Sequence, residues 1–412
     1  MNRLFFGWRV VGAAFAIAVL SWGAGFYGPP IFLGALHEAH GWSLPLVSAA
    51  ITVHFLLGAA LVARLAGLHR RFGVAPMTRA GAVLTAIGLV GWGFAREPWQ
   101  LFLATPFSGA GWALTSGAAI NAMVSPWFDR RRPAALGMAF NGASMGGVIF
   151  SPLWVALIGL LGMGRAALLV AAVLLATMWI LAGRFLSFGP ADKGLQPDGG
   201  VPLPNAVVAS VEAAPLGSAL RDRRAATLIA GTTFGLFAQI GLVSQLFALL
   251  APRLGDPVAG SVIGLATACA IVGRTALGRV LPAGAGRRKV GAANLVVQAV
   301  GSLVLLSGGS LPYVLVGCVL FGLGLGNVTS LPPLIAQVEF RRADVPRVVA
   351  LVTAVSQAGY AFAPTIFALI VTASGPTGLF ATAAVVQLAA ATTLFWTGRN
   401  LACQALQSET TP

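Results

Sequence analysis

The sequence has few charged residues, and acidic residues are the scarcest of them. Of its 412 residues 9% are Asp, Glu, Lys or Arg and 57% are hydrophobic, whereas about 25% of an average soluble domain is charged. This composition excludes an ordinary soluble enzyme. The 26 Lys and Arg residues outnumber the 11 Asp and Glu residues and give a net charge of +15. They fall in small groups between long uncharged stretches, so we expect no nucleic-acid partner.

Cysteine and the common catalytic motifs are also scarce. The three cysteines, Cys269, Cys318 and Cys403, form no CxxC pair, which argues against a disulfide framework and a cysteine-bound metal. No Gly-x-x-x-x-Gly-Lys-Ser/Thr loop occurs, so ATP is not the expected energy source. Four dispersed histidines supply neither a metal cluster nor a nucleophile with its base. We therefore expect neither an enzyme nor a cofactor.

Long stretches without Asp, Glu, Lys or Arg dominate the chain. A bilayer core of about 30 Å requires about 20 helical residues. The charge-free stretches are 10–36, 41–63, 80–95, 98–128, 133–164, 166–183, 225–252, 257–273, 290–338 and 348–398. The last two are long enough for two helices each, and Gly/Pro-containing breakers lie near their middles, at 308–312 and 374–376. The pattern predicts an all-α membrane protein with twelve transmembrane helices.

One long polar segment separates the first six predicted helices from the last six. Residues 188–224 are rich in Pro and Gly, which is typical of a linker. We therefore predict two six-helix halves, residues 1–187 and 225–412. The halves share a pattern, because Phe128 and Phe340 each precede a basic loop and lie 24 positions before Pro152 and Pro364. Duplicated halves are typical of transporters.

The basic residues also predict the orientation in the membrane. With alternating loops, all but four of the 26 Lys and Arg residues fall on the same side as the N-terminus; the exceptions are Arg96, Arg165, Arg253 and Arg274. Because short cytoplasmic loops carry an excess of Lys and Arg, both termini and the linker are predicted to be cytoplasmic. We expect a multi-pass protein of the inner (plasma) membrane, embedded in the lipid bilayer and acting as a monomer.

Several motifs resemble those of one transporter family. They are Gly7-Trp8-Arg9-Val10-Val11, Tyr27-Gly28, Phe32, Gly41-Trp42-Ser43, and Trp127-Phe128 followed by Arg131-Arg132 and Gly137. With twelve predicted helices and a central linker, they resemble the major facilitator superfamily, and within it the bacterial monocarboxylate transporters close to the oxalate:formate exchangers. The resemblance covers the whole chain and implies alternating access between two halves.

The resemblance also implies gating motifs after predicted helices 2 and 8. In the superfamily these loops carry a Gly-x-x-x-Asp-x-x-Gly-Arg-Arg type motif. The matching positions are Arg70, Arg71 and Gly73 in the first loop and Gly278, Arg279, Gly286 and Arg287 in the second. His69 and Pro282 stand where the motif has Asp. Both copies therefore lack the carboxylate that usually latches the gate.

Arg274 is the one basic residue deep inside a predicted helix. It lies roughly 10 Å of helix from the cytoplasmic end, and an arginine at such depth costs at least about 2.5 kcal/mol. All eleven acidic residues lie in predicted loops, helix ends or the linker, so we expect no carboxylate to pair with a buried cation. The guanidinium either binds a substrate carboxylate through two parallel hydrogen bonds or reaches the headgroups. Gly273-Arg274-Thr275 resembles the family segment that holds the substrate arginine.

His54 is the other titratable candidate at membrane depth. A histidine with its ordinary pKa near 6.5 can carry the coupled proton or donate a hydrogen bond to the substrate, or it simply bonds to a neighbouring helix. Some family members place an Asp one turn before the arginine, where this chain has Ala270. A second set of candidate ligands comes from predicted helices 1, 4 and 11, which line the cavity in this superfamily: Tyr27, Asn121, Gln357 and Tyr360.

These features predict a secondary active transporter of small monocarboxylate anions that is coupled to protons. One alternative is carboxylate exchange, in which Arg274 is too costly to carry across the membrane without an anion. A second is a cation-drug antiporter of the same superfamily. That class usually has an acid inside the membrane and a Gly-Pro-x-x-Gly-Gly signature on its fifth helix, and this chain has neither. The expected partners are thus a small carboxylate and either a proton or a counter-anion.

Overall fold

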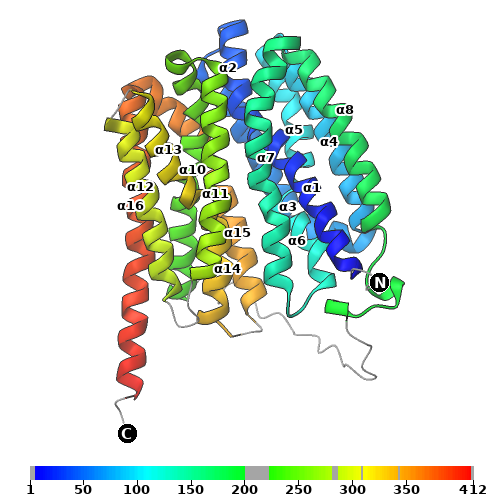
Figure 1. Cartoon of the computed structure of the whole chain (residues 1–412), viewed down its shortest axis with the longest axis vertical. Helices are drawn as coiled ribbons and strands as arrows, with labels where there is room; N and C mark the ends of the chain where they lie inside the picture. Colours follow the sequence, from blue (N-terminus) through cyan, green and yellow to red (C-terminus); the bar gives the residue numbers. More distant parts are fainter. Residues whose placement is uncertain (1–4, 200–221, 281–285, 308–309, 342–343, 410–412) are drawn as a thin grey trace. The chain divides into compact units, whose positions relative to one another are not determined.

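The computed structural model describes residues 5–199, 222–280, 286–307, 310–341 and 344–409, which form helices joined by short turns (Figure 1). The first part of the chain contains α1 (Phe6–Gly25), α2 (Gly28–His40), α3 (Leu44–Phe72), α4 (Val74–Phe94), α5 (Pro98–Thr115), α6 (Gly117–Val124), η1 (Ser125–Trp127), α7 (Arg132–Leu161), α8 (Met163–Leu181), and the short turns η2 (Ala182–Leu186), η3 (Ala191–Lys193) and η4 (Pro197–Gly199). The second part contains α10 (Arg223–Leu254), α11 (Asp256–Val280), α12 (Arg287–Ser307), α13 (Leu311–Leu325), α14 (Asn327–Glu339), α15 (Val345–Tyr360) and α16 (Ala363–Glu409).

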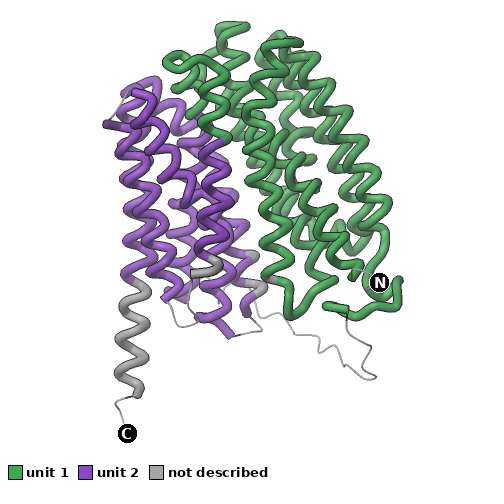
Figure 2. The backbone as a smooth tube through the Cα atoms, in the orientation of Figure 1, with its two compact units in different colours: residues 1–208, 246–264 green, residues 209–245, 265–412 purple. Residues whose placement is uncertain are grey.

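The chain forms two compact units (Figure 2). Unit 1 comprises residues 1–208 and 246–264, and unit 2 comprises residues 209–245 and 265–412. In unit 1, α1 packs along α7, while α5 packs between α3 and α4. In unit 2, α12 packs against α13 and α16. Unit 1 therefore includes the C-terminal end of α10 and the start of α11, in addition to the first eight α-helices.

Ten helical stretches of the described residues are long and apolar enough to cross a membrane. The predicted breakers interrupt helices at the expected places. α12 ends at Ser307 and α13 begins at Leu311, and the 46-residue stretch Leu351–Trp396 changes direction at Gly375, whose φ is +67°. That stretch is about twice as long as one crossing requires. The all-α membrane fold is confirmed, and these lengths are consistent with twelve crossings.

Four of the predicted transmembrane helices are broken near their middles. The breaks lie between α1 and α2, α5 and α6, α13 and α14, and α15 and α16. At the first break Tyr27 precedes Gly28 and two prolines, and at the third Gly326 follows a glycine-rich turn. Prolines lack the N–H that continues a helix, and glycine weakens one. In transporters such breaks expose main-chain groups that bind substrates and ions.

Glycines let helices of one unit approach closely. A Cβ atom added at Gly142 of α7 would lie 2.2 Å from the carbonyl oxygen of Phe15 in α1, and one added at Gly146 would lie 2.6 Å from that of Val19. Spacing of small residues by four positions places them on one helix face, where backbones can touch. Gly142 and Gly146 therefore form a close-packing surface between α7 and α1.

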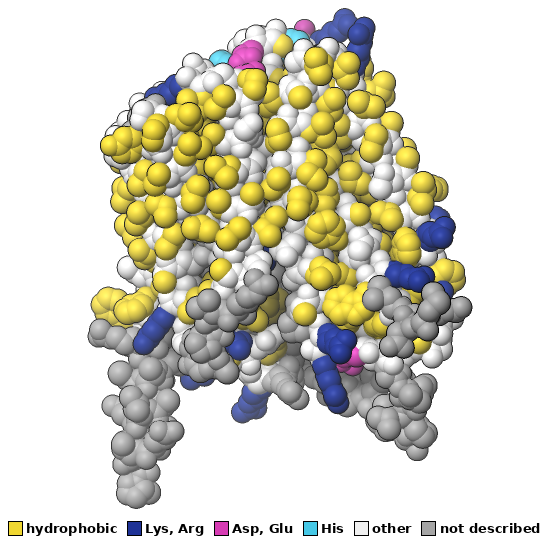
Figure 3. Space-filling view, in the orientation of Figure 1, with side chains coloured by type: hydrophobic (Ala, Val, Ile, Leu, Met, Phe, Trp, Pro, Cys, Tyr) yellow, Lys and Arg dark blue, Asp and Glu magenta, His cyan; other side chains and the backbone are white. Residues whose placement is uncertain are grey.

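Apolar side chains cover most of the face shown in the space-filling view, and charged side chains lie mostly near its two ends (Figure 3). Many large apolar residues are exposed, among them Leu160, Ile180, Val385 and Trp396, which are 80%, 63%, 65% and 64% exposed. Such surface is unfavourable in water and favourable against lipid tails. The surface thus fits a multi-pass membrane protein.

Candidate functional site

Arg274 lies on α11 of unit 2 and reaches the break between α13 and α14. Its Nε and Nη2 atoms both donate to the carbonyl oxygen of Gly326, at 3.3 and 3.1 Å. A Cβ atom on residue 326 would lie 2.7 Å from Nη2, so a larger residue there would displace the guanidinium. Arg274 is half-buried. It is anchored at a helix break by a main-chain carbonyl and not by a carboxylate.

Side chains from three helices donate hydrogen bonds to carbonyl groups at this break. The consecutive carbonyls of Gly324, Leu325 and Gly326 accept hydrogen bonds from Asn294 of α12 (3.1 Å), Gln239 of α10 (3.1 Å) and Arg274 of α11. Because a helix break leaves carbonyls without helical partners, these side chains replace the missing backbone bonds. Asn294 and Gln239 carried no signal in the sequence that distinguished them from other polar residues in a helix bundle.

Buried amide groups around this break have capacity to bind a ligand. Oε1 of Gln239, Oδ1 of Asn327 and both amide atoms of Gln298 have no hydrogen-bond partner among the described residues. These residues are 4%, 4% and 0% exposed. Unsatisfied buried polar atoms are costly and call for an explanation such as a bound polar molecule. Arg274, the carbonyls at the break and these amides therefore form the candidate binding site of unit 2.

The other predicted ligands lie beside helix breaks. In unit 2, Gln357 and Tyr360 belong to the last turn of α15, before its break with α16. Tyr360 and Leu277, one turn after Arg274, pack against the same apolar cluster. In unit 1, Tyr27 is buried at the break between α1 and α2. Asn121 is exposed on α6, where its Oδ1 accepts from Ser125 at 2.8 Å.

His54 of α3 is buried inside unit 1, where it faces α4 and α5. It is 1% exposed, and its Nδ1 lies 2.8 Å from Oγ of Ser108. Trp92 donates to that hydroxyl at 3.2 Å, and the hydroxyl can donate to the carbonyl of Thr105 at 3.3 Å. When the hydroxyl donates to Thr105, Nδ1 of His54 donates to the hydroxyl.

A small cavity adjoins this histidine. Its volume is about 10 Å³, near the minimum for one water molecule, and its walls include His54, Thr85, Ser108 and Trp112. Nε2 of His54, Oγ1 of Thr85 and Nε1 of Trp112 have no hydrogen-bond partner in the described part of the chain. The cavity therefore has room for at most one water molecule beside His54.

The gating arginines of the first segment, Arg70 and Arg71, lie in a helix and not in a loop. α3 continues to Phe72, so Arg70 and Arg71 form its last turn, and Gly73, with φ +84°, is the whole connection to α4. Burial lowers the pKa of His69, so a neutral imidazole occupies the place of the motif carboxylate. The charge-free stretch 41–63 predicted a shorter helix, because the helix continues beyond the bilayer core.

The second gating segment lies partly outside the described residues. Gly278 and Arg279 belong to the last turn of α11, which ends at Val280, and Gly286 directly precedes α12. Pro282 lies outside the described residues. Arg287, the first residue of α12, donates to the carbonyl of Leu334 in α14. It therefore links two helices of unit 2 at one end.

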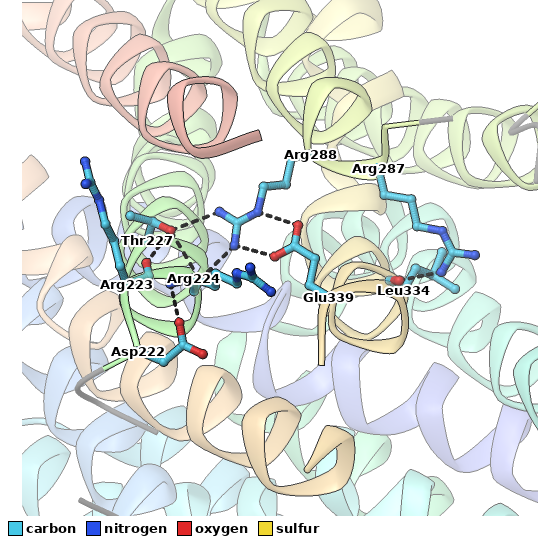
Figure 4. Close-up of polar contacts among 8 residues, drawn as sticks. All are labelled: Asp222, Arg223, Arg224, Thr227, Arg287, Arg288, Leu334 and Glu339. Carbon is cyan, nitrogen blue, oxygen red and sulfur yellow. Dashed lines mark hydrogen bonds and ion pairs between the residues drawn. The ribbon is translucent and has the colours of Figure 1, made fainter. Parts of the chain in front are cut away.

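A buried ion pair lies beside this contact and corrects the expectation that no carboxylate meets a buried cation (Figure 4). Arg288 of α12 is 2% exposed and binds both carboxylate oxygens of Glu339, at 2.6 and 2.7 Å. It also donates to Thr227 Oγ1 at 3.0 Å and to the Arg224 carbonyl at 2.7 Å. One guanidinium thus joins the ends of α10, α12 and α14. The residues are too far apart in sequence for pattern analysis to pair them.

We expect Glu339→Ala to lower the free energy of unfolding by about 3 kcal/mol, because it leaves Arg288 buried without its anion. The matched control is Asp129→Ala, which removes the exposed pair of Asp129 with Arg132 (2.9 Å; side chains 67% and 46% exposed). That loss should stay below about 1 kcal/mol. Unfolding of the purified variants in detergent measures both. Equal effects of the two substitutions would show that the buried pair is not a special contact.

Part of the predicted linker folds onto unit 1. The carboxylate of Asp198 accepts hydrogen bonds from the backbone N–H groups of Asp129, Arg130 and Arg131, at 3.1, 2.7 and 3.3 Å. These groups directly precede α7, so Asp198 caps its positive end. Slight desolvation raises the pKa of Asp198, but the three N–H groups and the charge of Arg131 outweigh it and lower that pKa overall. The cap is therefore lost only as the pH falls through this lowered value.

Comparison with protein families gives one match over most of the chain. A family model described as the Major Facilitator Superfamily matches residues 13–341. Monocarboxylate transporter 11 of Mus musculus is 33% identical over 176 residues, which are 41% of this chain and 38% of the relative. Monocarboxylate transporter 13 of Bos taurus is 36% identical over 107 residues, 26% of this chain and 25% of the relative. The matched segments span less than half the length of either relative.

A solved structure shares the fold. It is a bacterial homologue of the human lysosomal transporter Spinster, in an inward-facing and occupied conformation. The TM-score is 0.72, and the alignment covers 97% of this chain and 98% of that one, at 15% sequence identity. At this identity the likeness concerns the fold alone. The arrangement of helices described above is thus that of a known transporter fold.

Proposed function

This chain belongs to the Major Facilitator Superfamily, as its motifs indicated, and we propose that it carries small monocarboxylate anions across the membrane by alternating access. Members of this superfamily are transporters and not enzymes. The relatives named above as monocarboxylate transporters support the substrate class. We propose the inner membrane as its location, with both termini in the cytoplasm, from the distribution of Lys and Arg.

The position of Arg274 carries the proposal. Its guanidinium is half-buried at a helix break, with main-chain carbonyls and buried amides around it. A guanidinium offers its donors in a planar fork whose geometry matches a carboxylate. The amide atoms of Gln239, Gln298 and Asn327 can bind further substrate oxygens. Tyr27, Asn121, Gln357 and Tyr360 remain candidate ligands in this proposal.

The surroundings favour a small monoanion with an apolar tail. Leu277 and Tyr360 pack on an apolar cluster that includes Leu331, Val352 and Leu394. An apolar wall beside one cation suits lactate, pyruvate or a branched keto acid, whereas a dicarboxylate requires a second cation to balance its second charge.

A panel of carboxylates tests the substrate class. We expect three- to five-carbon monocarboxylates to raise the midpoint of thermal unfolding of the purified protein, because a ligand that binds only the folded state stabilises it. At ten times Kd the gain is about 1.4 kcal/mol. The neutral amides of the same acids are the control and should have no effect. Stabilisation by lipophilic cations but not by carboxylates would contradict the proposal and favour the drug antiporter.

A further inference from the structure

A groove opens on unit 1 between the start of α1 and the end of α8. It measures about 410 Å³ and is lined by Arg9, Gly12 and Ala13 of α1, by Leu181 of α8, and by Arg184 and Phe185 of η2. Arg9, Gly12 and Ala13 follow the i, i+3, i+4 spacing of one helix face. Figure 1 shows the first turns of α1 beside the end of α8. The groove therefore has apolar walls and two guanidinium groups.

The charge of this groove is entirely positive. Arg9 and Arg184 are both exposed, and neither has a carboxylate within ion-pair distance in the described part of the chain. Arg79 of α4 lies behind η2, because a Cβ atom added at Gly183 would be 2.3 Å from its Nη2. Its guanidinium stacks on Trp179 at 5.0 Å, and its buried Nε has no hydrogen-bond partner among the described residues. Arg9 and Arg79 thus lie near η2, which itself carries Arg184.

The groove also has room for an apolar chain. Gly12 is exposed, and a Cβ atom added there would meet nothing within 4 Å. The groove lies within the membrane-crossing stretches Phe6–His40 and Met163–Leu186, close to an end of each. A cationic site at the edge of an apolar span matches the boundary between lipid headgroups and acyl chains.

We propose that this groove binds one anionic phospholipid. Arg9 and Arg184 donate to the phosphate oxygens, and the acyl chain lies over Gly12, Ala13 and Leu181. Arg79 adds positive potential from behind η2. The π-helical turn η2 positions Arg184 toward the groove, and such turns are frequent at functional sites. The site is separate from the carboxylate site of unit 2, and its test does not depend on transport.

Native mass spectrometry of the delipidated full chain, titrated with phosphatidylglycerol, tests this proposal. We expect one tightly bound lipid and about tenfold weaker binding of phosphatidylcholine. Arg9→Gln with Arg184→Gln should weaken phosphatidylglycerol binding about thirtyfold, since each basic residue contributes about one kcal/mol to anionic-lipid attraction. Gly12→Phe should weaken it at least tenfold by filling the groove, since a Cβ atom at residue 12 meets nothing within 4 Å.

The matched control is Arg96→Gln with Arg165→Gln, which removes the same charge from exposed positions elsewhere on unit 1. We expect this variant to bind phosphatidylglycerol as the wild type does. Equal loss of phosphatidylglycerol affinity in the control would show that net charge alone causes the effect, and it would overturn the proposal. Wild-type binding in the Gly12→Phe variant would place the lipid elsewhere. Displacement of the lipid by millimolar glycerol phosphate would identify a free-phosphate site and also overturn it.

Discussion

Arg274→Ala is expected to weaken monocarboxylate binding about a hundredfold. The substitution removes two charge-assisted hydrogen bonds, each of which contributes about 1.5 kcal/mol or more to binding. Arg274→Lys keeps the charge but loses the planar fork, so we expect it to be impaired as well. Isothermal titration or the thermal-shift panel with the best monocarboxylate measures both affinities. Arg253→Ala, which removes an exposed arginine from the end of α10, should bind as the wild type does.

A second variant separates binding from folding. Gly326→Ala places a Cβ atom 2.7 Å from Nη2 of Arg274 and displaces the guanidinium without removing it. If the arginine binds substrate, Gly326→Ala should lose affinity for the monocarboxylate. Arg274→Ala should also lose affinity but remain a folded, monodisperse protein. Wild-type affinity in Arg274→Ala would contradict the assignment and leave the contact with Gly326 as a purely structural one.

The helices could be predicted from the sequence because charged side chains are costly in the bilayer core. A helix crossing the bilayer must satisfy its own backbone and exclude ionic groups, so the charge-free stretches outlined the helices, and breakers such as Gly375 divided the long ones. The ends were less predictable, as α3 shows by continuing to Phe72. Beyond the bilayer core water solvates Arg70 and Arg71, so the helix can continue outside the core.

The site was only partly predictable. Arg274 stood out because an arginine inside an apolar stretch is costly. Its contact with Gly326 could not be found this way, nor could those of Gln239 and Asn294 with the two neighbouring carbonyls. These residues are neutral and come together only when helices pack around the break. The same holds for Arg288 and Glu339, whose pairing depends on where α12 and α14 end. Tertiary distance, and not residue type, decides such contacts.

Energy coupling is the second large effect, and we expect proteoliposomes without internal substrate to accumulate monocarboxylate only under an inward proton gradient. His54 is the proposed proton carrier. Its Nδ1 lies within hydrogen-bond distance of Ser108 Oγ and its ring lines a small cavity, so protonation would place a positive charge inside unit 1. His54→Ala should reduce gradient-driven accumulation at least about tenfold, because no protonated imidazole then offsets the anion charge.

The competing mechanism is exchange, and the same liposomes distinguish it. If Arg274 crosses only with an anion bound, uptake should be absent until a monocarboxylate is placed inside, whatever the proton gradient. His40→Gln is the matched control for the histidine, because His40 is exposed and stacks on Trp42 at 4.8 Å outside the buried network. Accumulation that persists in His54→Ala would keep symport but assign the proton to another group. Uptake that requires internal anion would establish exchange and defeat symport, since a proton symporter can return empty after releasing both its anion and its proton.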